Sequence, residues 1–99
     1  MTSPTIIPLE DKALPTECYV FKHSTRCPVS TAAASVVRLY QWGLPLYWVN
    51  VVEQRELSGW VADSLGVRHE SPQLIRISAG KASGVLNHSA IQATSIDRM

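Results

Sequence analysis

The residues best suited to chemistry in this chain surround Cys27, in the stretch KHSTRCPVS that covers residues 22–30. The cysteine lies between Arg26 and Pro28, and Ser30 stands where a second cysteine would complete a CxxC pair. A thiolate is the nucleophile of thiol–disulfide exchange, so Cys27 is a candidate catalytic residue. An inert cysteine in an ordinary loop is the alternative that fits the same position.

The residues after Cys27 predict that the cysteine lies at the start of a helix. Apolar residues between 29 and 40 recur with helical spacing, and Pro28 suits the first helical position, where its missing N–H would be unpaired anyway. The first turn of a helix carries unpaired N–H groups and partial positive charge, which lower the pKa of a thiol placed there. Arg26, and His23 if it is protonated and near, would act in the same direction.

The serine at position 30 limits what an active Cys27 could do. Ser30 cannot attack a mixed disulfide, so an external thiol would have to resolve one formed on Cys27. The Ser30 hydroxyl either donates to the Cys27 thiolate or makes a local hydrogen bond in the first helical turn. Cys18 begins the preceding predicted strand, and at roughly 3.3 Å per residue it falls at the far end from the loop. We therefore expect Cys18 to be structural.

The elements that position this loop follow from hydrophobic periodicity. Strands are predicted at 18–23, 46–52, 73–78 and 82–87, helices from Pro28 to near Trp42, around 57–65 and over 89–98, and a short edge strand at 5–9 within the proline-rich segment 1–17. A right-handed crossover makes the first two main strands parallel, and a short glycine turn makes the last two antiparallel. The order β-α-β-α-β-β-α predicts an α/β mixed sheet with helices on both faces, the layout of the thioredoxin fold.

Length and composition limit the possible functions. The 99 residues suit a single domain over 1–99, with 45% hydrophobic and 17% charged residues and a net charge of +1. Dispersed charges argue against nucleic-acid binding, and no apolar run reaches the roughly 18 residues of a membrane span. The N-terminus does not resemble a signal peptide, so we expect a cytoplasmic protein with reduced thiols. The spacing of the two cysteines fits neither a disulfide scaffold nor a metal site.

A second signal is Ser71-Pro72, in the stretch HESPQL directly before a predicted strand. In thioredoxin folds a cis-proline stands at that place and faces the cysteine loop. The Ser71 backbone would then be free to pair with an extended thiol ligand, as a strand pairs with a sheet edge. The alternative is a trans proline that only begins the strand.

Two motifs, FKHSTRCPVS and LGVRHESPQLI, and the separation between them resemble the monothiol bacilliredoxin family of thioredoxin-fold proteins. The resemblance covers about residues 19–91. It implies an oxidoreductase that removes bacillithiol, a low-molecular-weight thiol, from protein mixed disulfides. It assigns Cys27 as the nucleophile. It assigns Thr25, Arg26, Pro28, Val29 and Ser30 to the active-site loop, and Ser71 and Pro72 to the thiol-substrate wall.

The resemblance also implies partners: bacillithiolated proteins and bacillithiol as co-substrate, with no bound cofactor, in a monomer or weak dimer. The chain departs from the family in its short N-terminal region, in Arg26 and at Gly84, where an aromatic residue is expected. The missing side chain predicts either that a nearby tryptophan fills the gap or that the ligand groove is altered. A non-catalytic binding module and a thiol-based oxidative-stress sensor are the alternative functions.

Overall fold

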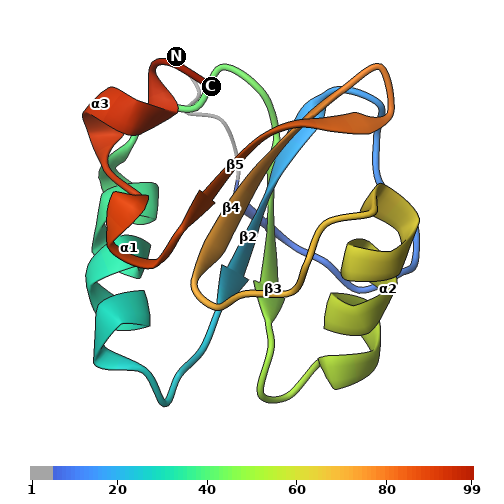
Figure 1. Ribbon diagram of the computed structural model, residues 1–99, viewed down its shortest axis with the longest axis horizontal. Helices are drawn as coiled ribbons and strands as arrows, with labels where there is room; N and C mark the ends of the chain where they lie inside the picture. Colours follow the sequence, from blue (N-terminus) through green and yellow to red (C-terminus); the bar gives the residue numbers. More distant parts are fainter. Residues whose placement is uncertain (1–5) are drawn as a thin grey trace.

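The computed structural model describes residues 6–99, which form a sheet with helices packed against it (Figure 1). The strands are β1 (Ile6–Pro8), β2 (Cys18–His23), β3 (Leu46–Asn50), β4 (Gln73–Ser78) and β5 (Lys81–Asn87). The helices are α1 (Pro28–Leu39), α2 (Arg55–Leu65), the 3-10 helix η1 (His88–Ala90) and α3 (Ala93–Ile96). This order follows the predicted succession of strands and helices.

The sheet is mixed, as predicted. Its strands lie in the order β1-β3-β2-β4-β5. Strand β3 runs parallel to both β1 and β2, whereas β4 is antiparallel to β2 and to β5. The predicted edge strand is present as β1, which includes Pro8 at the sheet edge, where a missing ladder donor is tolerated. Pro4 and Thr5 lie outside the described residues.

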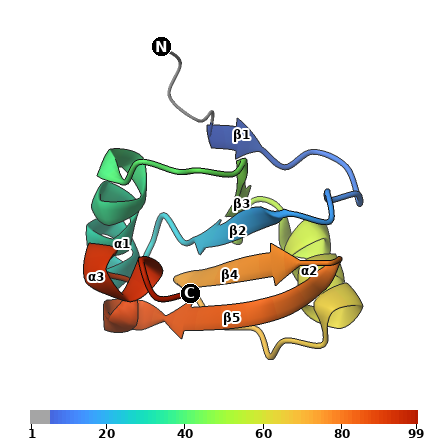
Figure 2. The same cartoon turned by 90° about the horizontal axis from the view of Figure 1, so that it is seen from above.

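Helices cover both faces of the sheet, with α1 and α3 on one side and α2 on the other (Figure 2). Successive side chains of a strand point to opposite faces, so each face has its own core cluster. Phe21 packs with Ala33 and Val37 on the α1 side. Its neighbour Val20 packs with Val61 on the α2 side. The two clusters fix β2 rigidly in the middle of the molecule.

Helix α1 ends earlier than the sequence pattern predicts. The helix was expected to reach Trp42, but Tyr40 already has an extended backbone, with φ −69 and ψ 142. The Trp42 indole N–H instead donates to the Val37 carbonyl, 2.8 Å away, and the Trp42 side chain is buried. Burying this large ring over the helix end and satisfying its only donor outweighs three further helical residues.

Strand β3 also stops before its predicted end at residue 52. The Asn50 side-chain oxygen accepts hydrogen bonds from the Val52 and Glu53 backbone N–H groups and so starts a turn. The strand is covered on both faces as predicted, because Leu46 belongs to one core cluster and Val49 to the other.

The C-terminal segment differs most from prediction. A helix was expected over 89–98, but the chain forms η1 and then α3, only four residues long. His88 has a left-handed backbone with φ 54, and Ile91 leaves the helical conformation between the two helices. This break lets both Ile91 and Ile96 bury their side chains against the α1 side.

The gap expected at Gly84 is filled by the last residue and not by a tryptophan. A β-carbon added at Gly84 would lie 3.5 Å from Met99 Cε and 3.7 Å from Arg76 Cβ. Met99 therefore covers the surface of β5 that the missing side chain of Gly84 leaves open. No helix within residues 6–99 is long and apolar enough to cross a membrane.

Candidate functional site

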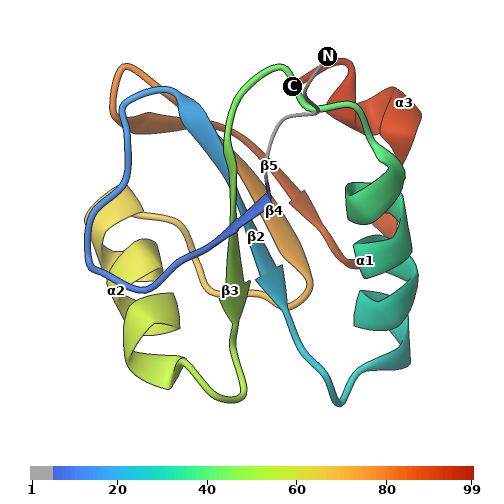
Figure 3. The same cartoon turned by 180° about the vertical axis from the view of Figure 1, so that it is seen from behind.

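Three segments that carry candidate residues meet at one edge of the sheet. The parallel pairing of β2 with β3 aligns His23 with Asn50, so the loops that follow both strands leave the same edge. The antiparallel pairing of β2 with β4 aligns Lys22 with Gln73, which brings Ser71-Pro72 to that edge as well. Two opposite views of the molecule show the loops after β2 and β3 at this same edge, at the bottom of Figures 1 and 3.

Cys27 is the N-cap residue of α1, as predicted. Its backbone is extended, with φ −115 and ψ 119, and Pro28 follows at the first helical position. The Cys27 carbonyl accepts the first helical hydrogen bond, from the Thr31 N–H at 3.1 Å. The cysteine is partly exposed, and no hydrogen bond to its sulfur is found within residues 6–99. The thiol is therefore accessible at the positive end of a helix that spans twelve residues.

The cysteine loop is open to solvent except at one residue. The exposed residues are Thr25, Arg26, Pro28 and Val29. Val29 is apolar, yet 43% of its surface is exposed. Ser30 is fully buried. The loop residues expected around the thiol therefore form an exposed rim, and Ser30 faces the protein interior.

The Ser30 hydroxyl is held by two partners from the end of β2. Its oxygen lies 2.8 Å from His23 Nδ1 and accepts a hydrogen bond from the Ser24 N–H at 2.9 Å. The direction of the His23–Ser30 hydrogen bond is set by the tautomer of the His23 ring, because the hydroxyl can donate to Nδ1 or accept from it. Within the described residues Ser30 takes neither of the two roles considered: its hydroxyl bonds to His23 and Ser24, outside the helical turn, and so anchors α1 to the end of β2.

His23 is suited to a neutral role beside the thiol. Its side chain is largely buried and packs against the Phe21 and Trp48 rings. Burial, together with the positive charge of Arg38, lowers the pKa of His23 below its usual range. The ring is therefore uncharged at neutral pH, so the structure does not support a protonated His23 that stabilises a thiolate by its charge.

The Ser71-Pro72 bond is cis, the isomer expected from the fold. The Pro72 carbonyl accepts a hydrogen bond from the His88 N–H at 2.8 Å, which ties the loop to the end of β5. The Ser71 hydroxyl oxygen is buried and has no hydrogen-bond partner within the described chain. Buried polar atoms are usually paired, so the unpaired Ser71 hydroxyl is an exception at the edge of the site.

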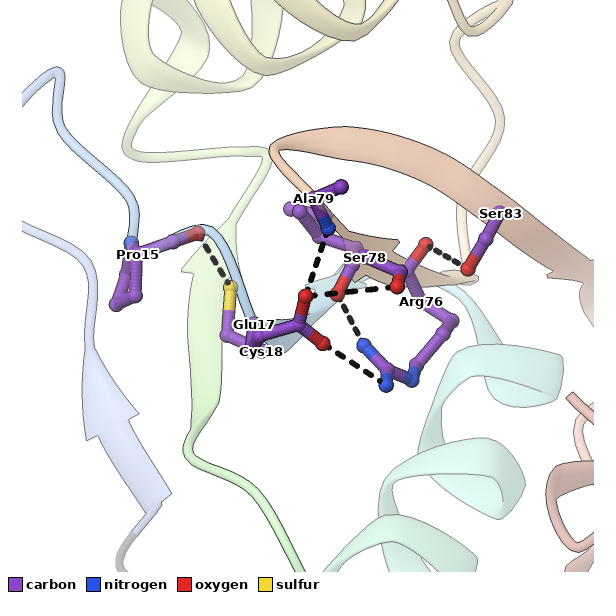
Figure 4. Close-up of polar contacts among 8 residues, drawn as sticks. Pro15, Glu17, Cys18, Arg76, Ser78, Ala79 and Ser83 are labelled. Carbon is purple, nitrogen blue, oxygen red and sulfur yellow. Dashed lines mark hydrogen bonds and ion pairs between the residues drawn. The ribbon is translucent and has the colours of Figure 1, made fainter.

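Cys18 lies at the opposite end of β2 and is fully buried (Figure 4). Its thiol donates to the Pro15 carbonyl at 3.5 Å, and burial raises the pKa of Cys18 to about 11. The neighbouring Glu17 carboxylate accepts the Ala79 N–H at 2.7 Å and pairs with Arg76 at 3.2 Å, which closes the turn between β4 and β5. These contacts make this end of the sheet a structural element.

Lys22 is a site residue that sequence reasoning missed. It is fully buried, and its Nζ lies 3.1 Å from His69 Nδ1, which in turn lies 3.3 Å from Ser58 Oγ. Burial lowers the pKa of Lys22 to about 8, against the opposing effect of Asp63. The signal was the alternation of β2, which places position 22 on the same covered face as Val20.

Hollows lie on both sides of the cysteine loop. One, of about 350 Å³, is mainly apolar and is lined by α1 residues, among them Pro28 and Val29, together with Ile91 and its neighbours. The other, of about 420 Å³, is lined by Arg26, Val51, Val52, Arg55 and His69. A smaller hollow of about 220 Å³ adjoins it and shares Val51, Arg55 and His69.

Within residues 6–99, no group of three or more histidine, cysteine, aspartate or glutamate side chains is placed to hold a metal ion. The reactive group at the site is the Cys27 thiol. A partly exposed cysteine at a helix N-terminus, with a cis-proline loop at the same edge of the sheet, is an arrangement suited to thiol–disulfide exchange.

The family model of the monothiol bacilliredoxin BrxC matches residues 4–96. The chain belongs to the monothiol bacilliredoxin family. This match confirms the resemblance carried by the two sequence motifs, and the bacilliredoxin family together with the fold assigns the chain to thiol redox proteins.

Solved structures confirm the thioredoxin fold. A candidate oxidoreductase with a thioredoxin fold is 25% identical, with a TM-score of 0.83 over 94% of this chain and 91% of its own. The thioredoxin of Malassezia sympodialis is 12% identical, with a TM-score of 0.71 over 99% of this chain and 90% of its own. Mitochondrial thioredoxin 3 of Saccharomyces cerevisiae is 12% identical, with a TM-score of 0.64 over 94% and 91%.

Proposed function

We propose that this bacilliredoxin removes bacillithiol from protein mixed disulfides through the single nucleophile Cys27. The observation that carries the proposal is the pairing of an accessible thiol at a helix N-terminus with a buried, fully engaged serine three residues later. Exchange needs an accessible thiolate, which Cys27 can supply. Ser30 has no sulfur and is turned toward His23, so it takes no part in breaking a disulfide.

The reaction runs in two exchanges that balance without another oxidant or reductant. The Cys27 thiolate attacks the bacillithiol sulfur of the mixed disulfide, the old S–S bond breaks, and the substrate protein leaves as a thiolate. A free bacillithiol thiolate then attacks the adduct, which releases the Cys27 thiolate and bacillithiol disulfide. Over the two steps the substrate protein's sulfur is reduced to a thiolate, the free bacillithiol sulfur is oxidised into the disulfide, and Cys27 returns to its starting state.

The surrounding residues have distinct roles in this proposal. Thr25, Arg26, Pro28 and Val29 form the exposed rim that meets the substrate, and Ser71 and Pro72 form the opposite wall. His23 and Ser30 act as positioning residues that fix the start of α1, and so the thiol, relative to β2. The proposal places the protein in the cytoplasm as a monomer or weak dimer, with bacillithiolated proteins and bacillithiol as partners.

A transfer experiment tests the proposal. A peptide that carries bacillithiol on its only cysteine is mixed with the protein, and the protein mass is measured. We expect a mass increase of one bacillithiol in the wild type and in Cys18→Ala, and none in Cys27→Ala. The proposal is refuted if the wild type takes up no adduct, or if Cys27→Ala takes up as much.

A further inference from the structure

The larger hollow beside the cysteine loop has two cationic side chains in its lining. Arg26 and Arg55 line it together with His69, and within the described chain none of its lining residues is acidic. Neither arginine forms a salt bridge to a carboxylate within residues 6–99. Two guanidinium groups that share one hollow without a counterion can both turn toward an anion placed in it.

A buried ammonium group lies beneath this hollow. Lys22 Nζ contacts His69, a residue that lines the hollow, and the Lys22 side chain is fully buried. An ammonium carries three donors, and His69 Nδ1 is its only hydrogen-bond partner in the described chain. Asp63 acts on Lys22 through its charge but forms no salt bridge with it within residues 6–99. A buried cation without an anionic partner leaves local positive potential.

The N-terminus of α2 adds to this potential. Arg55 is the first residue of α2, and the N-terminal end of a helix carries partial positive charge. The acidic residue in that first turn, Glu56, is already paired with Lys12 at 2.7 Å. The hollow therefore has positive charge on the side of the cysteine loop and on the side of α2, and one of its lining residues, His69, contacts the buried Lys22.

The hollow is also next to the reacting sulfur. Arg26 belongs to it and directly precedes Cys27 in the chain. A small molecule joined to Cys27 through a disulfide would extend past Arg26 toward Arg55. A volume of about 420 Å³ accommodates a molecule the size of a substituted cysteine.

We propose that this hollow binds a carboxylate of the small thiol whose sulfur exchanges with Cys27, with Arg26 and Arg55 as its ligands. The inference rests on the proposed exchange at Cys27 and adds a specificity for small thiols that carry carboxylates. The bound carboxylate orients the disulfide while the Cys27 thiolate attacks the small thiol's sulfur and the partner thiolate leaves, so no further reactant is needed.

A matched pair of substrates tests the proposal. One peptide carries N-acetylcysteine as a mixed disulfide, and the other carries N-acetylcysteine amide, which lacks the carboxylate. The readout is the ratio of the two rates of adduct transfer to Cys27. The variants are Arg55→Gln, which removes a ligand outside the cysteine loop, and Arg98→Gln, which removes the same charge beyond α3, on the opposite side of the sheet.

We expect the ratio of acid to amide rates to fall about five-fold in Arg55→Gln, the loss typical of one charge-assisted contact in a partly exposed site. The ratio should stay at the wild-type value in Arg98→Gln. An unchanged ratio in Arg55→Gln, or an equal fall in Arg98→Gln, overturns the carboxylate site.

A binding experiment separates this site from the exchange reaction. N-acetylalanine has the carboxylate but no thiol, so its binding does not depend on chemistry at Cys27. We expect it, and not its amide, to shift the NMR signals of the Arg55 side chain and the His69 ring. NMR shifts without adduct transfer would support the carboxylate site and refute the exchange at Cys27. Adduct transfer without NMR shifts, at a ratio that Arg55→Gln leaves unchanged, would support the exchange and refute the carboxylate site.

Discussion

Replacing Ser30 by alanine tests how the structure holds the cysteine loop. The Ser30 hydroxyl is buried and joins His23 Nδ1 at 2.8 Å to the Ser24 N–H at 2.9 Å. Alanine leaves both groups without this partner. Leaving a buried polar group unsatisfied costs about 1–3 kcal/mol, so we expect the free energy of unfolding to fall by about 2 kcal/mol.

The loss is large enough to measure by two methods. In a domain of this size, 1 kcal/mol shifts the midpoint of thermal unfolding by about 4–8 °C, so we expect a decrease of about 8–16 °C. Urea unfolding followed by tryptophan fluorescence should show a lower midpoint with an unchanged slope.

Ser35→Ala is the matched control, because it makes the same substitution in the same helix. The Ser35 hydroxyl is exposed and donates only to the Thr31 carbonyl, at 3.3 Å. We expect Ser35→Ala to change the free energy of unfolding by less than about 0.5 kcal/mol. If Ser30→Ala is no less stable than Ser35→Ala, the proposed anchoring of α1 to β2 is wrong.

Three further substitutions test other parts of the structure, each by urea unfolding. The pKa of Lys22 is lowered to about 8, so between pH 8 and 9 the unfolded chain holds a proton that the native chain has released. The free energy of unfolding should therefore rise with pH, by up to about 1 kcal/mol per pH unit. Lys22→Met should abolish this rise. An equal slope in Lys22→Met would contradict the burial of the charge. The pKa of Cys18 is raised to about 11, so wild-type stability should fall above pH 9 as the unfolded thiol ionises first, and Cys18→Ala should lessen that fall. Gly84→Ala should stabilise the protein by about 0.5 kcal/mol, because the new β-carbon meets Met99 at ordinary contact distance; a loss above about 1 kcal/mol would show that β5 has no room for it.

The sequence predicted the features that depend on local chemistry. Pro28 placed the start of α1 and therefore the position of Cys27, because proline fits the first helical turn. The helix predicted around 57–65 ends at Gly66, which has the left-handed backbone, φ 64, that favours glycine after a helix. The succession of elements also predicted a mixed sheet, with the first two main strands parallel and the last two antiparallel, and the structure confirms both pairings.

Contacts between distant segments could not be predicted in this way. Lys22 and His69 are 47 positions apart and meet only because β4 pairs with β2, which brings the preceding loop beside Lys22. The role of Ser30 stayed open because a serine in a first helical turn has several possible partners. The break at His88 was missed because the buried position of Ile91, and not its helical spacing, determines the local backbone.

The central claim is that Cys27 alone carries the exchange, without a second thiol in the chain. The most direct measurement is peptide mass mapping of the wild type after exposure to a bacillithiolated peptide, with samples taken before and after free bacillithiol is added. We expect one adduct per chain, on Cys27, which persists until free bacillithiol releases it. A disulfide between Cys18 and Cys27, or loss of the adduct without added thiol, would contradict the account.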